Sequence, residues 1–116
     1  MPTATTEELQ TFKAAFFKAL AHPVRIKILE LLVNGEMNVQ ELQEALGVEQ
    51  PVASQQLAVL RVNNIVAGRK DGVSVRYSVR DPLIGEMLSI ARRIFGNHLV
   101  STQGLLRQLK HERRGR

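Results

Sequence analysis

Residues 39–64 read VQELQEALGVEQPVASQQLAVLRVNN, and this stretch decides the fold. Asn38 precedes it as an N-cap, and Glu41, three residues further on, completes a capping-box pair. Gly47 then ends the first helix as a left-handed C-terminal cap. The apolar face of that helix consists of Val39, Leu42, Ala45 and Leu46, which recur at helical spacing. The stretch therefore predicts two short helices that are broken at a glycine.

The second predicted helix begins near Pro51, because a proline in the first helical turn has no intrahelical N–H bond to lose. Its predicted buried positions are Val52, Leu57, Val59 and Leu60, and its polar face consists of Gln50, Ser54, Gln55 and Arg61. Two helices joined by a tight glycine turn are the layout of a helix-turn-helix, whose second helix can enter the DNA major groove. An ordinary helical hairpin inside an all-α core is the alternative.

A β-hairpin is predicted next, over residues 65–79. The runs IVAGRK (65–70) and VSVRYSV (73–79) have strand character, and Asp71-Gly72 between them predicts a two-residue turn in which both positions take positive φ. A hairpin directly after a helix-turn-helix is a wing. This wing carries the basic residues Arg69, Lys70 and Arg76. Such a hairpin can be merely solvated, but its position favours contact with phosphate.

Two helices are predicted before the quoted stretch. The first, residues 6–20, begins with Thr6 as its cap, and its broad apolar face favours burial against a second subunit. That face consists of Leu9, Phe12, Phe16, Phe17 and Leu20. The second helix starts at Pro23 and ends at Gly35. His22, beside the proline, is expected to cap this helix rather than to act as a ligand or a base.

One long helical pattern is predicted after the wing. Asp81 is its N-cap and Pro82 its first helical residue. Gly96-Asn97 is predicted to break it, and Leu105, Leu106 and Leu109 continue a second amphipathic piece. The basic run 110–116 is expected to be a solvated end that adds to the attraction for nucleic acid.

Composition limits the classes of protein that fit. The 116 residues suit one domain, and 16 Lys and Arg against 11 Asp and Glu, a net charge of +5, favour a polyanionic partner. Cysteine is absent, which excludes disulfides and thiolate metal sites.

No apolar run is long enough to span a membrane, and residues 1–10 lack the character of a secretory signal, so a cytoplasmic location is expected. An enzyme is not expected, because His22, His98 and His111 are scattered without a nucleophile or a carboxylate pair beside them.

The order of these elements resembles the ArsR-type (arsenic-repressor-like) family of bacterial winged-helix repressors. The resemblance rests on FKALAHPVRIKILELL (17–32), VQEL (39–42), SQQLAVLR (54–61) and the wing with Tyr77. It runs from about residue 12 to residue 79.

The resemblance implies a mainly α fold with a small β-hairpin wing, in one domain over residues 1–116. The helix-turn-helix lies at about 38–64, the wing at 65–79, and dimerisation helices at about 6–20 and 82–110. It also implies a homodimer that binds an imperfect inverted repeat in double-stranded DNA and represses transcription. The expected DNA contacts are Gln50, Val52, Ala53, Ser54, Gln55, Gln56, Arg61, Arg69, Lys70 and Arg76. The expected dimer contacts are Leu9, Phe12, Phe16, Phe17, Leu88, Ala91, Phe95 and Leu99.

The chain departs from the family where metal-sensing members carry their ligands. Asn38 and Gln40 stand at the cysteine positions of the metal-sensing motif, and the last helix offers His98 without a set of partner ligands. No cofactor and no bound metal are therefore expected, and the effector is not identified. A winged-helix module that binds protein instead of DNA is the alternative function. The basic wing and the polar Gln/Ser face argue against it.

Overall fold

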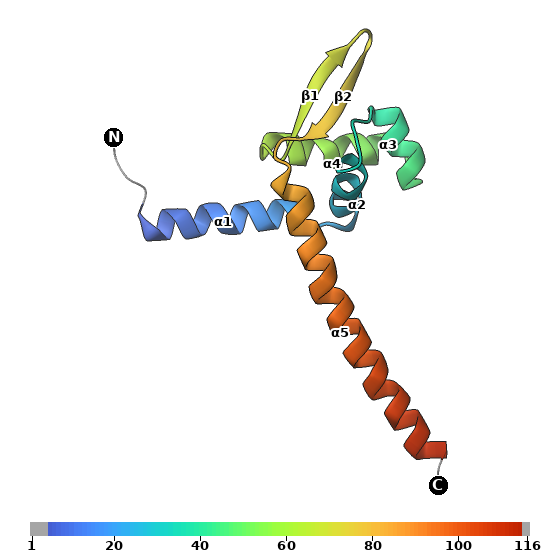
Figure 1. Ribbon diagram of the computed structural model, residues 1–116. Helices are drawn as coiled ribbons and strands as arrows, with labels where there is room; N and C mark the ends of the chain where they lie inside the picture. Colours follow the sequence, from blue (N-terminus) through green and yellow to red (C-terminus); the bar gives the residue numbers. More distant parts are fainter. Residues whose placement is uncertain (1–4, 115–116) are drawn as a thin grey trace. The chain divides into compact units, whose positions relative to one another are not determined.

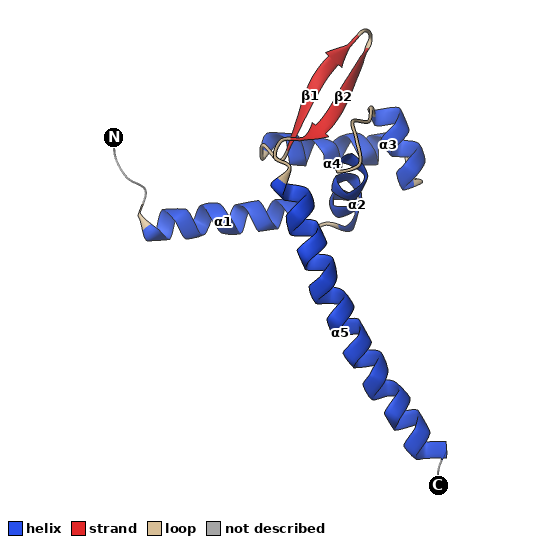
Figure 2. Ribbon diagram, in the orientation of Figure 1, coloured by secondary structure: helices blue, strands red, loops and turns tan. Residues whose placement is uncertain are grey.

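The computed structural model describes residues 5–114, and of residues 98–102 and 112–114 it describes the backbone alone. These residues form five helices and one two-stranded hairpin (Figures 1 and 2). The elements are α1 Thr6–Leu20, α2 Pro23–Leu32, α3 Val39–Leu46, α4 Gln50–Val62, β1 Val66–Asp71, β2 Ser74–Val79 and α5 Leu83–Arg114. The chain divides into two compact units, Met1–Ile84 and Gly85–Arg116, the second of which lies entirely within or beyond α5.

Local capping sets the start of each of the first three helices. Thr5, and not Thr6, is the N-cap of α1: its hydroxyl accepts a hydrogen bond from the Glu8 amide at 3.1 Å, and the Glu8 carboxylate accepts one from the Thr5 amide at 2.8 Å. The predicted cap was wrong by one residue because two threonines stand side by side. His22 caps α2 as predicted, since its Nδ1 accepts a hydrogen bond from the Val24 amide at 3.1 Å.

The helix-turn-helix follows the sequence pattern closely. The Asn38 side chain accepts a hydrogen bond from the Glu41 amide at 2.8 Å, and the Glu41 carboxylate accepts one from the Asn38 amide at 3.0 Å, which is the predicted capping box. Gly47 ends α3 at φ 68° and ψ 33°, the left-handed conformation that favours glycine. Pro51 lies in the first turn of α4, where it leaves the helix intact.

The core of the winged-helix unit lies between α2, α3 and α4. Its fully buried side chains are Ile28, Leu29, Leu42, Leu60, Ile65 and Val66. Leu57 is also buried, as predicted, whereas Val52 is 37% exposed and does not belong to the core. Only the C-terminal end of α1 is buried, at Ala19 and Leu20. The rest of that helix leaves its apolar face uncovered within the single chain.

The hairpin pairs in an antiparallel register from Val66 opposite Val79 to Asp71 opposite Ser74. Its two-residue turn is therefore Gly72-Val73, one residue later than predicted. Gly72 has φ 65°, and Val73 is not among the residues with positive φ. A β-branched side chain disfavours that conformation, so one position, and not two, adopts it. A backbone bridge from Met37 to Tyr77, with N–O distances of 3.1 and 2.8 Å, adds a strand-like contact that the sequence did not predict.

The last helix is continuous where a break was predicted. Asp81 caps its start by accepting a hydrogen bond from the Leu83 amide at 2.9 Å, and α5 then runs through Gly96-Asn97 to Arg114. A glycine in a helix interior costs only about 1 kcal/mol relative to alanine, which long flanking helical segments outweigh. Among the described residues, no helix is long and apolar enough to cross a membrane.

Candidate nucleic-acid interface

Helix α4 turns two different sides to core and solvent. Ala53, Leu57 and Leu60 lie one helical turn apart and are at most 3% exposed. The Ala53 side chain therefore packs in the core and is not available on the surface, although it was expected among the DNA contacts. The exposed side carries Gln50, Pro51, Val52, Gln55, Ala58, Arg61 and Val62, with Ser54 half-buried at its edge. The N-terminal half of this side presents the polar groups that the sequence singled out.

Gln56 is held within the fold by a residue that the sequence analysis missed. The Arg25 guanidinium donates to Gln56 Oε1 at 2.8 Å and to the Ala19 carbonyl at 2.9 Å. Arg25 thus joins the end of α1 to α4, and Gln56 is engaged on the inner side of its helix. The arginine of the HPVR sequence could have been noticed as a cation directly after a helix break, where free helical carbonyls need donors.

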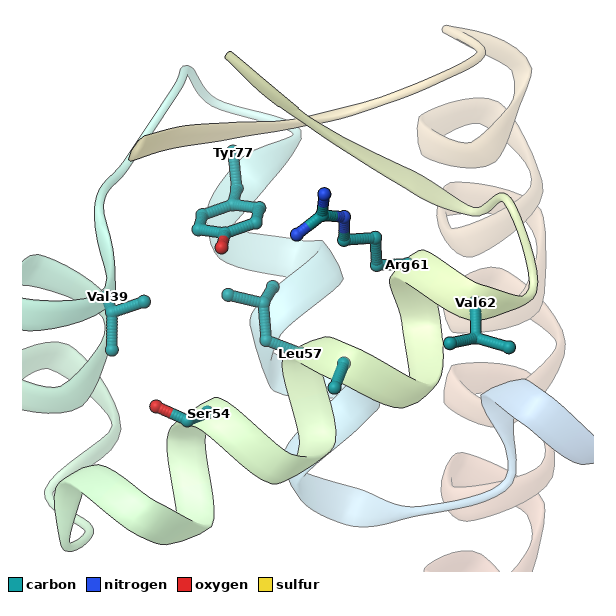
Figure 3. Close-up of a pocket in the computed structure, with 7 residues that line it drawn as sticks. Val39, Ser54, Leu57, Arg61, Val62 and Tyr77 are labelled. Carbon is teal, nitrogen blue, oxygen red and sulfur yellow. The ribbon is translucent and has the colours of Figure 1, made fainter. Parts of the chain in front are cut away.

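A hollow of about 400 Å³ lies between α3, α4 and β2. It is lined by Val39, Ser54, Leu57, Ala58, Arg61, Val62 and Tyr77. In Figure 3 the Arg61 guanidinium extends toward the Tyr77 ring across the hollow, and the Ser54 hydroxyl lies at its α4 edge. A guanidinium and two hydroxyls can all donate to phosphate oxygens, and the apolar wall suits a sugar. Arg61 and Ser54 were expected in the interface, whereas Tyr77 was not.

The wing arginines have partners inside the fold. Arg69 and Arg76 lie directly opposite each other in the hairpin, an arrangement that repulsion destabilises. Arg69 forms an ion pair with Glu36 at 3.1 Å, and Arg76 forms one with Glu41 at 3.3 Å and donates to the Glu36 carbonyl at 2.8 Å. The hydrogen bond from Arg69, with the charges of Arg69 and Arg76, holds the pKa of the Glu36 carboxyl below its usual value. The same hydrogen bond and the Glu36 charge raise the pKa of Arg69.

Lys70 differs from these two arginines. It is exposed, and within the part of the chain that the structure describes it forms no ion pair. The sequence named the three wing cations together and did not distinguish them. Lys70 is the wing cation most available to a phosphate, and Arg69 and Arg76 also fix the wing against the segment that leads into α3.

Residues 22–67 match the family model described as bacterial regulatory protein, arsR family. The chain is 44% identical over 106 residues to the HTH-type transcriptional regulator Rv0081 of Mycobacterium tuberculosis, which covers 90% of this chain and 93% of that protein. The chain belongs to the arsR family. It is also 34% identical to a biofilm growth-associated repressor of Xylella fastidiosa, over 82% of this chain and 86% of the repressor.

Solved structures of similar proteins share the fold. The crystal structure of M. tuberculosis Rv0081 superposes with a TM-score of 0.75 at 47% identity, covering 80% of this chain and 94% of that one. The homodimeric winged helix-turn-helix DNA-binding domain Mb0332 of Mycobacterium bovis superposes with a TM-score of 0.74 at 27% identity, covering 85% and 94%. The predicted family and the predicted winged helix-turn-helix fold are both confirmed.

Several of the expected dimer contacts of this arsR-family chain are exposed apolar side chains. On α1, Phe12 is 75% and Phe17 60% exposed, Leu9 is exposed, and Phe16 stacks edge-on against Phe17 with ring centroids 5.5 Å apart. On α5, Phe95 is 64% exposed, and Leu88 and Ala91 are half-buried. The side chains of Leu99 and His98 lie outside the described residues. Elsewhere in the described chain, no group of three or more His, Asp and Glu residues could hold a metal ion.

Proposed function

We propose that this protein is a homodimeric transcriptional repressor that binds an operator of two inverted half-sites in duplex DNA. The observation that carries the proposal is the exposed polar N-terminal half of α4, which lies beside a hollow lined by hydrogen-bond donors. The relative from X. fastidiosa is named a repressor, and the neighbour from M. bovis is described as homodimeric and DNA-binding. Such a regulator acts in the bacterial cytoplasm, where the DNA is.

In this proposal α4 enters the major groove, and its first two turns read the bases. Gln55 is exposed and can pair through its amide with N6 and N7 of an adenine. Ser54, at the edge of the hollow, can donate to or accept from several bases. Gln50 and Val52 flank these two residues on the exposed side. Gln56 is not a base contact, because Arg25 engages its amide oxygen.

The DNA backbone is bound on both sides of Ser54 and Gln55, the residues that contact the bases. The hollow between α4 and β2 takes a phosphate against Arg61 and Tyr77, with the neighbouring deoxyribose against the apolar wall. Lys70 on the wing reaches a second phosphate. Twofold symmetry of the dimer then places the two half-sites about one helical turn apart, or a multiple of it. Occupation of such a site represses transcription by excluding other proteins from the same DNA.

The dimer forms through the apolar faces of α1 and α5. A face with Phe12 and Phe17 uncovered is an aggregation liability in a monomer, and a second copy of the same chain offers the matching apolar surface. The inducing signal is not a thiolate-bound metal, because the chain contains no cysteine.

The test is a comparison of two neighbouring glutamines. After selection of the operator from random duplexes, Gln55→Ala should weaken operator binding by about 1–3 kcal/mol and random-duplex binding much less. Gln56→Ala is the matched control, which should lower the free energy of unfolding and leave the preference for the operator unchanged. Equal losses on both duplexes would make Gln55 a phosphate contact. A wild-type protein that binds no duplex would refute the proposal and leave a protein-interaction module.

A further inference from the structure

The net positive charge of the chain is confined to its second unit. Residues 1–84 contain nine basic residues (Lys and Arg) and nine acidic residues (Asp and Glu). Residues 85–116 contain seven basic residues and two acidic ones. The boundary between these two ranges is the division between the compact units. The winged-helix unit is therefore neutral as a whole, and the net charge of +5 belongs to α5 and the two residues after it.

Several cations of the winged-helix unit are also engaged within the fold. Arg69 and Arg76 pair with Glu36 and Glu41, and Arg25 donates to Gln56 and to a carbonyl at the end of α1. Long-range attraction of a polyanion depends on net charge, which this unit lacks. The net charge that favours this attraction lies in residues 85–116.

The charge of α5 is concentrated toward its C-terminal end. From residue 103 onward the sequence reads QGLLRQLKHERRGR, with five Lys and Arg against one Glu. Arg107 and Lys110 are both exposed, and at a spacing of three residues they share a helix face. Leu105, Leu106 and Leu109 are the apolar residues of this segment, and they too are exposed within the single chain. The segment is a basic amphipathic helix.

We propose that the distal segment of α5, residues 103–114, binds the phosphate backbone of duplex DNA without reading its sequence. The proposal rests on the proposed function, which supplies the partner: DNA held by α4 is present at high local concentration around the rest of the same molecule. A helical segment of this length spans about 18 Å, along which duplex DNA carries about ten negative charges. This contact adds to the salt-dependent affinity that Arg61 and Lys70 of the winged-helix unit supply.

Other polyanions fit the segment less well. A helix that lies on a membrane needs its apolar face free to enter the interface, and the apolar side chains described between residues 103 and 111 are three leucines. In the proposed dimer those leucines extend the apolar face of α5 toward the second copy. Arg107 and Lys110 stay exposed and can bind the phosphates of the nucleic acid.

The test uses the full-length protein and the salt dependence of binding. Arg107→Gln with Lys110→Gln removes four charges per dimer, and the slope of log affinity against log salt should become less steep by about two to four on operator and random duplex alike. The matched control, Lys13→Gln with Lys27→Gln, removes the same charge from exposed positions on α1 and α2 and should leave the slope unchanged. Arg107→Lys with Lys110→Arg keeps the charge and should keep the wild-type slope.

Each other outcome has a defined meaning. Slopes that are equal for the distal variant and the control would overturn the proposal. So would a distal variant that binds both duplexes normally and loses binding to vesicles containing phosphatidylserine, which would assign the segment to a membrane surface. A wild-type protein with no preference for any operator would refute the proposed function. The slope on random duplex would still decide whether the distal segment binds DNA.

Discussion

Glu36 is the acidic residue on which the geometry of the wing depends. Its side chain pairs with Arg69 and its carbonyl accepts from Arg76, so one residue binds both members of a repulsive cross-strand pair. The carboxylate is solvent-exposed, and the ion pair is accordingly sensitive to salt. The Arg69–Glu36 ion pair therefore mainly orients the wing and adds little to the free energy of unfolding.

Replacing Glu36 should change how stability depends on acid. The pKa of the Glu36 carboxyl is lowered in the folded state, so its contribution is present above the ordinary glutamate pKa and is lost as the pH falls through the lowered value. Denaturant titrations from pH 6 to pH 3 should therefore show a smaller loss of unfolding free energy in Glu36→Gln than in the wild type. Glu44→Gln, at an exposed position on α3, is the control and should follow the wild type. Identical curves for all three proteins would remove Glu36 from the acid response.

Gly68 lies on β1, at a position where side chains of β2 leave little room for a Cβ atom. A Cβ atom there would lie 2.9 Å from Val75 Cγ1 and 3.1 Å from the Tyr77 ring. Gly68→Ala should therefore lower the free energy of unfolding by about 1–3 kcal/mol, as overpacking does. It should also weaken DNA binding, because Tyr77 forms one wall of the hollow beside Arg61. Thermal melts and duplex titrations check both effects.

The control for Gly68 is Gly104→Ala on α5, where an added Cβ would meet no atom within 4 Å. Alanine there should be neutral or stabilising by up to about 1 kcal/mol, because glycine weakens a helix interior. Equal stability of the two variants would mean that the wing accommodates the methyl group.

Local contacts were predictable at the residue scale, and tertiary ones were not. Asn38 with Glu41, and His22 with Val24, could be predicted because each pair lies within one turn of the chain. The Arg25–Gln56 bond joins residues 31 apart, and the Arg69–Glu36 bond joins residues 33 apart. Periodicity carries no information about which distant polar groups meet. Gln56, Arg69 and Arg76 were for that reason predicted as DNA contacts without their partners inside the fold.

At the scale of the elements, the existence of each helix and strand was predictable but some boundaries were not. The hairpin turn moved by one residue because register depends on which side chains of both strands pack together, and not on the turn alone. The break at Gly96-Asn97 was wrong because glycine lowers helix stability without removing a hydrogen bond, as proline does.

The last helix should not sense divalent metals. Zinc prefers several nitrogen, sulfur or oxygen ligands in one place, and the described side chains of this protein offer no such cluster. Titration calorimetry with stoichiometric zinc should show no tight binding, and DNA affinity should be the same with and without the metal. Tight binding that disappears in His98→Ala would contradict this expectation.

The molecule as a whole should be a dimer at micromolar concentration. Phe12 is exposed on α1, and burying a phenylalanine contributes about 1.5–3 kcal/mol per side chain. Phe12→Glu should therefore raise the dimer dissociation constant at least about tenfold, as measured by sedimentation. Lys13→Glu, one residue further along the same helix, is the control and should remain dimeric. Sedimentation of the wild type as a folded monomer would exclude the proposed assembly.

The hydrogen bonds of Arg25 have a consequence for the energetics of assembly. The same guanidinium binds the last carbonyls of α1 and the inner amide of α4, so α1 cannot shift relative to α4 without loss of one of these bonds. A second subunit that binds α1 and restrains it therefore also restricts the positions that α4 can adopt. Coupling of this kind is reciprocal, because the free energy that one ligand contributes to the binding of another is returned in equal measure. In the proposed complex, subunit association and operator binding are therefore coupled, and the operator should strengthen dimerisation by the same factor by which dimerisation strengthens operator binding.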